Sequence, residues 1–444
     1  MEDGAPVAIV GGGYAGCAAA VTLASRGVPC VLHEAAPVLG GRARRVERDG
    51  FRLDNGQHLL LGAYARTLEL VARTGGGAYA RRPLSIAPFA PGQRDALTLV
   101  AGRAPGRLGT LVGLLAARGL TLRERLANLA WFRRLERAGF ARPPHETVAQ
   151  LLSPLPPRVA KLLWEPLNLA ALNTPAAAAS SQVFCNVLKA AFAGHGDDCD
   201  FVLPTTDLSA LFPESAASYV NAHGGRVLTH SRAQVFAADR ASATIAVGGR
   251  AHVVRAVIVA VGPHQLPHAF AAEALASRPD VGAAIGALEA LEYEPIVTVW
   301  LGYPARVAMP GPIARLDDDP GQWVLDRPDV LASAARTDVA QMLSMVISAS
   351  GPHTALAHDE LVRAADAQLR RIAPSLAPCV WSFAINEKRA TYACRPKRAR
   401  PAGPRLAPGL YLAGDYVDED FPATLEAAVR TGIAAAEACL ADRA

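Results

Sequence analysis

The sequence has few aromatic residues and few cysteines, and neither sign of charge dominates it. Aromatic residues make up 6% of the 444 residues, and the formal net charge is +5. The basic residues are scattered and form no stripe with interleaved aromatics, which argues against nucleic-acid binding. The seven cysteines form no CxxC pair. We therefore expect reduced thiols in a cytoplasmic compartment and no metal site.

The chain also lacks a long uninterrupted hydrophobic run. The longest uncharged candidate, residues 166–188, is broken by asparagine, proline and serine, so it does not predict a transmembrane helix. The N-terminal segment is apolar, but Glu2 and Asp3 stand where a secretory signal carries positive charge. We therefore expect a cytoplasmic protein whose N-terminal segment is retained.

What the N-terminus does contain is the pattern of a dinucleotide-binding unit. Residues 7–10 predict a buried parallel strand, a glycine turn follows it, and the next helix points its N–H groups at a pyrophosphate. A second strand leads to an acid that is placed to accept hydrogen bonds from an adenosine ribose. The expected contacts are Gly11, Gly13, Tyr14, Ala15, Gly16 and Glu34.

Two further segments resemble FAD enzymes. Gly40, Gly41 and Arg42 follow the ribose acid, as in enzymes of the glutathione-reductase-like class, where this loop lies over the pyrophosphate. Near the C-terminus, G-L-Y-L-A-G-D-Y predicts a buried strand, and a final helix opens soon after it. In the FAD-linked amine oxidase and carotenoid desaturase superfamily, such a segment contacts the ribityl chain and the flavin. The resemblance implies non-covalent FAD held here by Gly414, Asp415, Leu425 and Ala428.

These motifs predict an α/β fold with a discontinuous, glutathione-reductase-like FAD-binding Rossmann domain. We expect that domain at residues 1–75, 205–262 and 400–444. Residues 76–204 and 263–399 are expected to form a second domain with a mixed substrate sheet and a helical cap. A proline-rich loop is expected around residues 309–328. By analogy with the superfamily, backbone near Ala233 meets the adenine.

Four segments narrow the resemblance to the hydroxysqualene dehydroxylases, a squalene-associated, FAD-dependent, desaturase-like family of bacterial hopanoid biosynthesis. They are D-N-G-Q-H-L-L-L-G-A-Y (54–64), W-E-P-L-N-L-A-A-L-N-T-P (164–175), W-V-L-D-R (323–327) and E-K-R-A-T-Y-A (387–393). The resemblance spans nearly the whole chain. It implies reductive removal of the hydroxyl of hydroxysqualene, which gives squalene and consumes reduced FAD. One departure is Leu325, where an aromatic residue is expected.

The resemblance implies that Gly56, Gln57 and His58 cross the flavin face. His58 is a candidate proton donor near neutral pH, or a residue that only shapes the pocket. Glu165 lies among apolar residues, where a raised pKa would let it protonate a leaving hydroxyl. The alternative for Glu165 is a surface or capping acid.

Three residues are candidates for contacts to the substrate: Asn168, Asn173 and Tyr392. The two asparagines are expected either to orient the substrate hydroxyl or to cap and turn the chain. The analogy also brings Lys388 and Arg389 near the flavin, although their basic surroundings equally suit a solvated face. The sequence does not identify the electron donor to FAD.

A thirty-carbon isoprenoid gains on the order of 20 kcal/mol by leaving water, so an enzyme that acts on it must dock at a bilayer. We expect peripheral association with the inner face of the cell membrane. Residues 107–135 mix leucines with arginines and predict either an interfacial amphipathic stretch or ordinary core helices.

Three other functions remain open at this point. A carotenoid-type desaturase or isomerase would share every FAD motif. A flavin amine oxidase is disfavoured, because the strand E-P-I-V-T-V-W lacks the lysine that such enzymes carry near the flavin. The third alternative is a non-catalytic FAD-fold scaffold in a membrane enzyme cluster.

Overall fold

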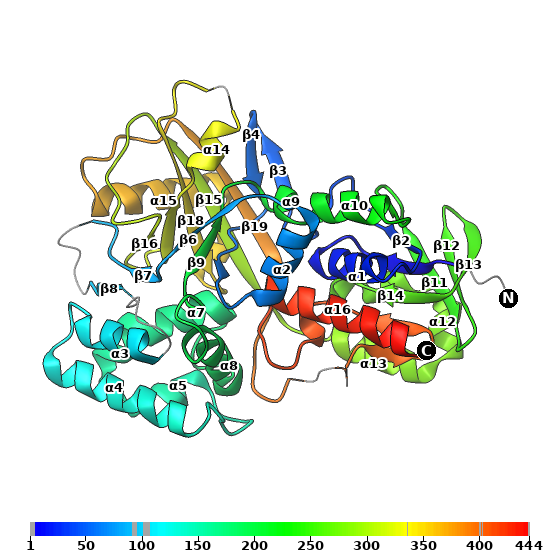
Figure 1. Cartoon of the computed structure of the whole chain (residues 1–444). Coiled ribbons are helices and arrows are strands. Elements are labelled where there is room, and N and C mark those ends of the chain that lie inside the picture. The colour runs from blue at the N-terminus through cyan, green and yellow to red at the C-terminus, as the bar shows by residue number, and fades with distance from the viewer. Residues whose placement is uncertain are drawn as a thin grey trace.

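The structure is a computed structural model that describes residues 5–90, 96–100, 107–334, 336–398, 401 and 403–442. A parallel sheet with its helices occupies one end of the molecule, and both chain termini lie at that end (Figure 1). An antiparallel sheet lies at the other end, above a group of helices. None of the seven cysteines, all of which lie in the described part of the chain, forms a disulfide bond.

The parallel sheet has six strands in the order β10-β2-β1-β14-β21-β20. These are Arg226–Leu228, Cys30–His33, Val7–Val10, Ala256–Val259, Leu410–Leu412 and Arg405–Ala407. All neighbouring pairs run parallel except β20 with β21. Its central strands β1 and β14 are fully buried runs of Val, Ile and Ala, as expected for a sheet covered on both faces. The sheet thus joins strands from the beginning, the middle and the end of the chain.

Helix α1 (Tyr14–Ser25) lies beside α16 (Leu425–Ala441), as Figure 1 shows, and also packs on α10 (Pro213–Ala222). A Cβ added at Gly432 would lie 2.1 Å from the carbonyl oxygen of Ala15, so only glycine lets α1 and α16 approach this closely. Beyond the parallel sheet lie the strands and helices β11 (Ala233–Ala238), β12 (Ala243–Val247), β13 (Arg250–Val254), α11 (Leu266–Ala269), α12 (Ala272–Ser277) and α13 (Pro279–Glu289).

The second large sheet is antiparallel, with the order β16-β17-β18-β15-β19. The strands are Ile313–Arg315, Trp323–Asp326, Gln341–Ser348, Tyr293–Tyr303 and Trp381–Tyr392. One face, which includes Val297, Val299 and Leu301 of β15, packs against α15 (His358–Ile372). The expectation of a plain loop at 309–328 is wrong, because Ile313 pairs with Leu325 and both β16 and β17 lie in that segment.

The helical group is built around a core of aromatic residues. It contains α3 (Arg107–Ala116), α4 (Leu122–Arg137), α5 (Val148–Leu152), α6 (Pro157–Val159), a π-helical turn (Ala160–Trp164), α7 (Glu165–Leu172) and α8 (Ser181–Phe192). Trp164 packs on Trp131 and donates from its indole nitrogen to Oδ1 of Asn128, at 2.8 Å. Among the described residues, no helix has the length and hydropathy needed to cross a membrane.

Shorter elements connect these parts. They are β3 (Arg45–Arg48), β4 (Phe51–Asp54), β5 (Leu60–Leu61), α2 (Ala65–Thr74), β6 (Tyr79–Arg82), β7 (Ser85–Ile86), β8 (Leu99–Val100), β9 (Phe201–Pro204), α9 (Leu208–Leu211) and α14 (Pro328–Ala332). The β3–β4 hairpin runs from the parallel sheet to the antiparallel one (Figure 1). It places the D-N-G-Q-H segment between the two sheets.

Candidate active site

The glycine turn at the end of β1 leaves open space in front of Gly13. A Cβ at Gly16 would lie 1.9 Å from the carbonyl oxygen of Gly11, so α1 presses directly on the turn. A Cβ at Gly13, by contrast, would have only the Cα of Gly41 within reach, at 4.0 Å. No side chain caps the start of α1 at Gly13, so its first N–H groups remain available to a ligand. An open cradle beside a helix N-terminus suits a pyrophosphate.

The Glu34 carboxylate directly follows β2 and holds the same turn. Its two oxygens accept hydrogen bonds from the backbone N–H groups of Gly12 and Ala36, each at 2.7 Å. Each oxygen keeps a second lone pair for a further donor such as a ribose hydroxyl. The backbone of Ser231 donates to the carbonyl of Glu34 at 2.8 Å, which brings the start of β11 at Ala233 to this side of the turn.

Arg42 and Asp415 form an ion pair of 2.6 Å between Nη2 and Oδ2. Arg42 also donates to the carbonyl of Ala390 at 2.7 Å, so it ties the turn to β19. Burial acts to lower the pKa of Arg42, but the charge and hydrogen bond of Asp415 outweigh burial and raise it. The pair lies beside Gly41, which itself lies against Gly13.

The loop that carries Asp415 is held from two sides. The Thr431 hydroxyl, on α16, accepts from the N–H of Gly414 at 3.0 Å. On the other side, the hydroxyl of Tyr392 donates to the carbonyl oxygen of Phe421 at 3.2 Å and lies 3.4 Å from the carbonyl oxygen of Asp415. Tyr392 is buried and supports this loop through its hydroxyl, and its expected contact to the substrate stays a prediction. Helix α16 opens at Leu425.

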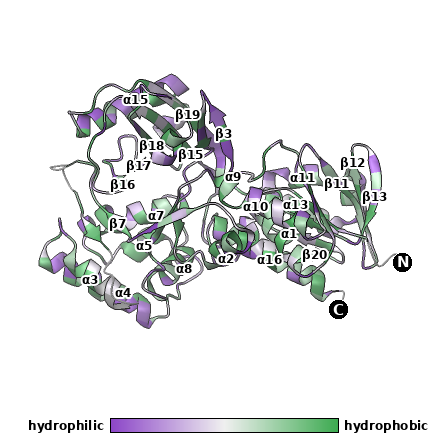
Figure 2. Cartoon of the chain, turned by 45° about the horizontal axis from the view of Figure 1, so that its top comes forward, coloured by the Kyte–Doolittle hydropathy of each residue, from purple (hydrophilic) through white to green (hydrophobic). Residues whose placement is uncertain are grey.

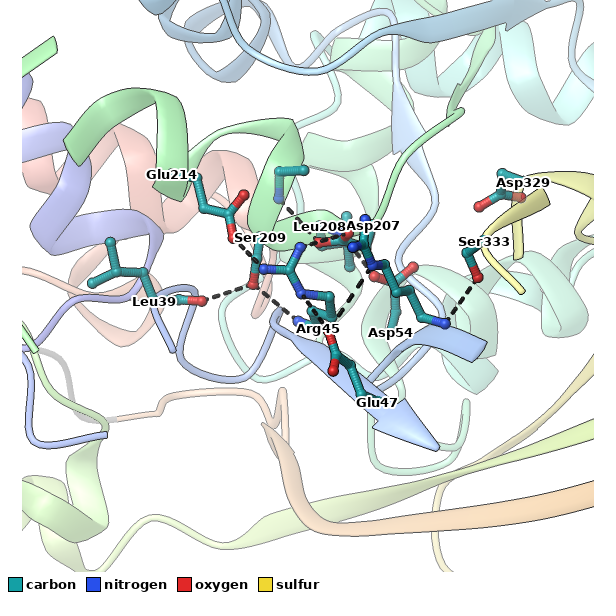
Figure 3. Close-up of polar contacts among 12 residues, drawn as sticks. Leu39, Arg45, Glu47, Asp54, Asp207, Leu208, Ser209, Glu214, Asp329 and Ser333 are labelled. Atoms are coloured by element: carbon teal, nitrogen blue, oxygen red, sulfur yellow. Dashed lines mark hydrogen bonds and ion pairs between the residues drawn. The ribbon is translucent and has the colours of Figure 1, made fainter. Parts of the chain in front are cut away.

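Asp54, at the end of β4, is a buried carboxylate held by two parts of the chain. Its Oδ1 accepts from the N–H of Leu208 at 2.8 Å, as Figure 3 shows, and its Oδ2 pairs with Arg327 at 3.1 Å. Arg327 also donates to Gln57 at 2.8 Å and pairs with Asp329 at 2.6 Å. Burial raises the pKa of Asp54 to about 6, although Arg327 opposes this rise. Arg327 therefore fixes the segment that leads to His58.

Arg45 pairs with Asp54 across the hairpin and fixes the same open end of it from the β3 side. Its N–H donates to the hydroxyl of Ser209 at 2.9 Å, and its guanidinium pairs with Asp207 and Glu214 (Figure 3). The Ser209 hydroxyl in turn donates to the carbonyl of Leu39 at 2.8 Å. These contacts join β3 to α9 and α10, so the hairpin is anchored where it leaves the parallel sheet.

His58 is held close to Gly56 by its own segment. Its Nδ1–H donates to the carbonyl of Gly56 at 2.9 Å, which leaves Nε2 free to face a ligand. Burial lowers the pKa of His58, the bond to Gly56 opposes this, and the charge of Arg42 lowers it further. A Cβ built on Gly56 would lie 3.9 Å from both Cε1 of His58 and Oγ1 of Thr298. The imidazole and this hydroxyl therefore converge on one point.

The predicted residues of the helical cap differ in burial and in hydrogen bonding. The apolar surrounding expected for Glu165 is wrong, because its side chain is exposed on the first turn of α7. Asn173 ends α7 in a left-handed conformation, donates to Thr391 at 3.0 Å and accepts from Ala349 at 2.8 Å. These bonds give Asn173 a structural role. Asn168 is fully buried and donates to Thr174 at 2.9 Å, while its Oδ1 has no partner.

From the sequence alone, Arg327, Thr298, His264 and Tyr293 received no individual role, although Arg327 and Thr298 lie in the segments W-V-L-D-R and E-P-I-V-T-V-W. His264 lies in a short helical turn (Pro263–Gln265) that comes soon after β14. Its backbone N–H donates to the Tyr293 hydroxyl at 3.2 Å, and the two rings lie edge to face at 5.8 Å. Burial lowers the pKa of His264, as do the nearby charges of Arg389 and Arg42. The signal for His264 was its place at the carboxyl end of a buried parallel strand. The side chains of Lys388 and Arg389 are exposed.

Comparisons with known proteins match the chain along almost its whole length. The model of the family of flavin-containing amine oxidoreductases matches residues 14–440. Hydroxysqualene dehydroxylase of Rhodopseudomonas palustris is 28% identical, with 98% of each chain covered. Carotenoid phi-ring synthase of Streptomyces griseus is 26% identical, with 99% of this chain and 88% of that protein covered. The solved structure of an oxidoreductase from Methanosarcina mazei has a TM-score of 0.74 at 16% identity and covers 96% of this chain and 98% of its own.

The site agrees with these matches. The open space before Gly13, the free lone pairs of Glu34 and the Arg42–Asp415 pair beside the turn fit FAD, which is the cofactor of the protein. The predicted α/β fold class with an FAD-binding Rossmann-like domain is confirmed. The exact domain boundaries and the individual cofactor contacts stay predictions. The chain belongs to the family of flavin-containing amine oxidoreductases.

Proposed function

We propose that this FAD-dependent oxidoreductase removes the hydroxyl group of hydroxysqualene and so forms squalene. The observation that carries the proposal is the position of His58 beside Gly56, on a segment clamped by Arg327 between the nucleotide sheet and the second sheet. The support from comparison is the match to hydroxysqualene dehydroxylase along 98% of both chains.

In the proposed reaction the C–O bond of an allylic alcohol breaks with addition of one proton, and water leaves. Reduced FAD supplies the hydride, with its electron pair, that forms the new C–H bond. Loss of an allylic hydroxyl leaves a delocalised cation, so the protein must exclude water and protonate the leaving oxygen. The reaction thus balances in atoms and charge: the alcohol, one proton and one hydride give squalene and water.

His58 is the group that we assign to the leaving oxygen. Its Nδ1 is held by the carbonyl of Gly56, so Nε2 carries the exchangeable proton when the ring is charged. The charge of Arg42 is one cause of its lowered pKa, and the negative charge of a bound cofactor beside Arg42 opposes that cause. The role of Glu165 as an acid loses its physical basis, because its side chain is exposed.

We also propose that the protein docks on the membrane surface through α3 and α4. Residues 107–137 carry seven arginines and two glutamates, a net charge of +5 that equals the net charge of the whole chain. In the same stretch Val112 and Leu122 are 52% and 68% exposed, and Leu115 and Leu126 are also exposed. Figure 2 shows apolar and polar residues mixed along both helices, at the edge of the molecule. Exposed leucines among arginines suit an anionic bilayer surface.

A second candidate is a desaturase or isomerase of carotenoid-type isoprenoids. The similarity to carotenoid phi-ring synthase along 99% of the chain favours it. The hydroxysqualene reading has the higher identity, at 28% against 26%, and covers more of its relative.

One experiment separates the two candidates. Purified protein with reduced FAD is incubated under anaerobic conditions with hydroxysqualene, and separately with a non-hydroxylated carotenoid precursor. We expect squalene from the first incubation and no product from the second. Absence of squalene, with product from the carotenoid precursor, would replace the proposed function by the second candidate.

A further inference from the structure

Thr298 lies in the middle of β15 and has a buried hydroxyl group without a partner. The residue is 1% exposed, and its Oγ1 makes no hydrogen bond. A buried hydroxyl without a partner loses its hydrogen bonds to water and gains none in return, so it destabilises the free protein. Such a group is retained most simply when a ligand completes it.

The Thr298 side chain lies on the face of the second sheet that is turned away from α15. Its neighbours on β15, Val297 and Val299, belong to the core under α15, and side chains alternate between the faces along a strand. Two partners across the sheet, Val346 and Ile385, are only partly buried, as are Gly56 and His58. Thr298 thus borders partly exposed residues between the sheet and the D-N-G-Q-H segment.

The place where Thr298 and His58 meet is defined by Gly56. A Cβ built on Gly56 would lie 3.9 Å from Oγ1 of Thr298 and 3.9 Å from Cε1 of His58. A ligand atom in front of Gly56 therefore comes within reach of a hydroxyl group and an imidazole at once. One group comes from β15 and the other from the segment after β4, so the pair exists only in the folded chain.

We propose that Thr298 and His58 together bind the hydroxyl group of an isoprenoid alcohol, and that Thr298 distinguishes this alcohol from the corresponding hydrocarbon. The inference rests on the proposed function and names the contact that selects its substrate. An alcohol oxygen accepts one hydrogen bond and donates another, and a threonine hydroxyl together with an imidazole Nε2 can satisfy both. Thr298 makes and breaks no covalent bond. With a hydrocarbon in the site its hydroxyl stays unpaired, so the hydrocarbon binds more weakly.

Ser344 provides a matched control. Its hydroxyl is also buried without a partner and lies on β18 opposite Trp300, whereas Thr298 lies opposite Val346. Ser344 is not among the atoms nearest to Gly56. Its removal tests whether any unpaired hydroxyl in this sheet has the effect that we assign to Thr298.

The test measures binding to the oxidised holoenzyme, which has no hydride to give, by titrating hydroxysqualene and squalene and following the flavin spectrum. The wild-type enzyme should bind the alcohol about tenfold more tightly than the hydrocarbon, the usual effect of one hydrogen bond in a buried site. Thr298→Val and Thr298→Ala should reduce this preference to about twofold or less. Thr298→Ser and Ser344→Ala should keep it.

Thermal unfolding gives a second readout. Because the hydroxyl is unpaired in the free protein, Thr298→Val should melt no lower than the wild-type protein. Four results would each overturn the inference. Two concern binding by the wild-type enzyme and the Thr298 variants: no preference of the wild-type enzyme for the alcohol, or full preference in both Thr298→Val and Thr298→Ala. The other two are an equal loss of preference in Ser344→Ala and a lower melting temperature of Thr298→Val. Failure of the proposed function would give a different result: the reduced wild-type enzyme would form no squalene, whatever its binding preference.

Discussion

Arg42 and Asp415 are separated by 373 residues of sequence and joined by an ion pair of 2.6 Å. The arginine belongs to the turn that faces the open space at Gly13, and the aspartate to the loop before α16. Because Arg42 also donates to β19, one side chain joins the first motif, the last motif and the second sheet. The predicted cofactor site is thus assembled from three distant parts of the chain.

The glycine turn yields a prediction that separates folding from cofactor binding. Gly13→Val should fold, because its Cβ has open space around it and its φ of −74° suits any residue, but it should purify without FAD. Gly16→Val is the matched control and should fail to fold, since its Cβ would lie 1.9 Å from the carbonyl of Gly11. Flavin absorbance and circular dichroism check both variants. Full flavin content in Gly13→Val would refute our interpretation of the turn.

Glu34→Ala should weaken FAD binding by about 1.5–3 kcal/mol, the range for a hydrogen bond to a charged group. The variant also loses the acceptor for Gly12 and Ala36, so Glu34→Gln, which keeps one carbonyl oxygen, is the comparison. Titration of the apoprotein with FAD measures the loss. Because no covalent attachment is expected, acid precipitation should release all of the flavin from the wild-type protein.

The ion pairs of Arg327 with Asp54 and Asp329 predict that replacing Arg327 destabilises the protein to an extent that depends on pH. Arg327→Met removes the partner of the buried Asp54 and of the partly buried Asp329, and should cost about 3–5 kcal/mol at pH 8. The pKa of Asp54 is raised from 3.8 to about 6, so the folded state holds its proton more tightly and loses stability as pH rises through that window. Because Arg327 stabilises the ionised form, the cost of the substitution should be smaller at pH 5 than at pH 8.

Urea unfolding of the wild-type and Arg327→Met proteins at both pH values makes that comparison. Adding Asp54→Asn to the variant should recover part of the loss, because one unpaired charge is then removed. An equal loss at pH 5 and pH 8 would mean that Asp54 does not titrate in this range.

His58 predicts the direction of the pH–rate profile. Burial lowers its pKa below 6.5, so if the charged ring is the acid, kcat should rise as pH falls through that lowered value. His58→Ala should keep FAD but lose about 10²–10⁴-fold in turnover and lose the acidic limb of the profile. Glu165→Gln should retain nearly full activity, because the Glu165 side chain is exposed. Normal turnover by His58→Ala with bound flavin would reassign the acid.

The proposed docking surface is tested with vesicles that contain phosphatidylglycerol. Leu122→Glu with Leu126→Glu should abolish flotation of the protein with these vesicles, since both exposed leucines would become charged. Val253→Glu is the control, because Val253 is as exposed as Leu122, at 68%, but lies on β13. High salt should release the wild-type protein, in line with an arginine-dependent contact. Flotation of the double variant at the wild-type level would reject this surface.

The features that the sequence predicted correctly are local motifs, made of residues that are close together in the chain. The strand, turn and helix from Val7 to Ser25, the acid Glu34 and the loop with Asp415 each combine a local hydrophobic run with glycine, and such runs predict buried strands. These motifs come close together in the fold because the carboxyl ends of parallel strands lie at the same edge of the sheet.

The rest depends on pairing over long distances, which no local pattern encodes. Arg327 meets Asp54 across 273 residues, and the approach of Thr298 to Gly56 depends on the register of β15 between β18 and β19. The apolar surrounding expected for Glu165 was wrong, because residues adjacent in sequence do not surround a side chain on a helix, where successive residues point about 100° apart. The exposed position agrees with the alternative of a surface acid.

The parallel sheet also sets the order of events during synthesis. Strand β1 leaves the ribosome early, but one neighbour, β14, comes from the middle of the chain, and β21 and α16 come from its last part. Until those segments emerge, β14 lacks its neighbour β21, and α1 lacks helix α16, whose Gly432 lies against the carbonyl of Ala15. The nascent N-terminus therefore exposes apolar strand and helix surface for most of translation, when such surface is prone to aggregate. The Arg42–Asp415 pair, and with it the predicted cofactor site, is therefore complete only after the segment that carries Asp415 has been made.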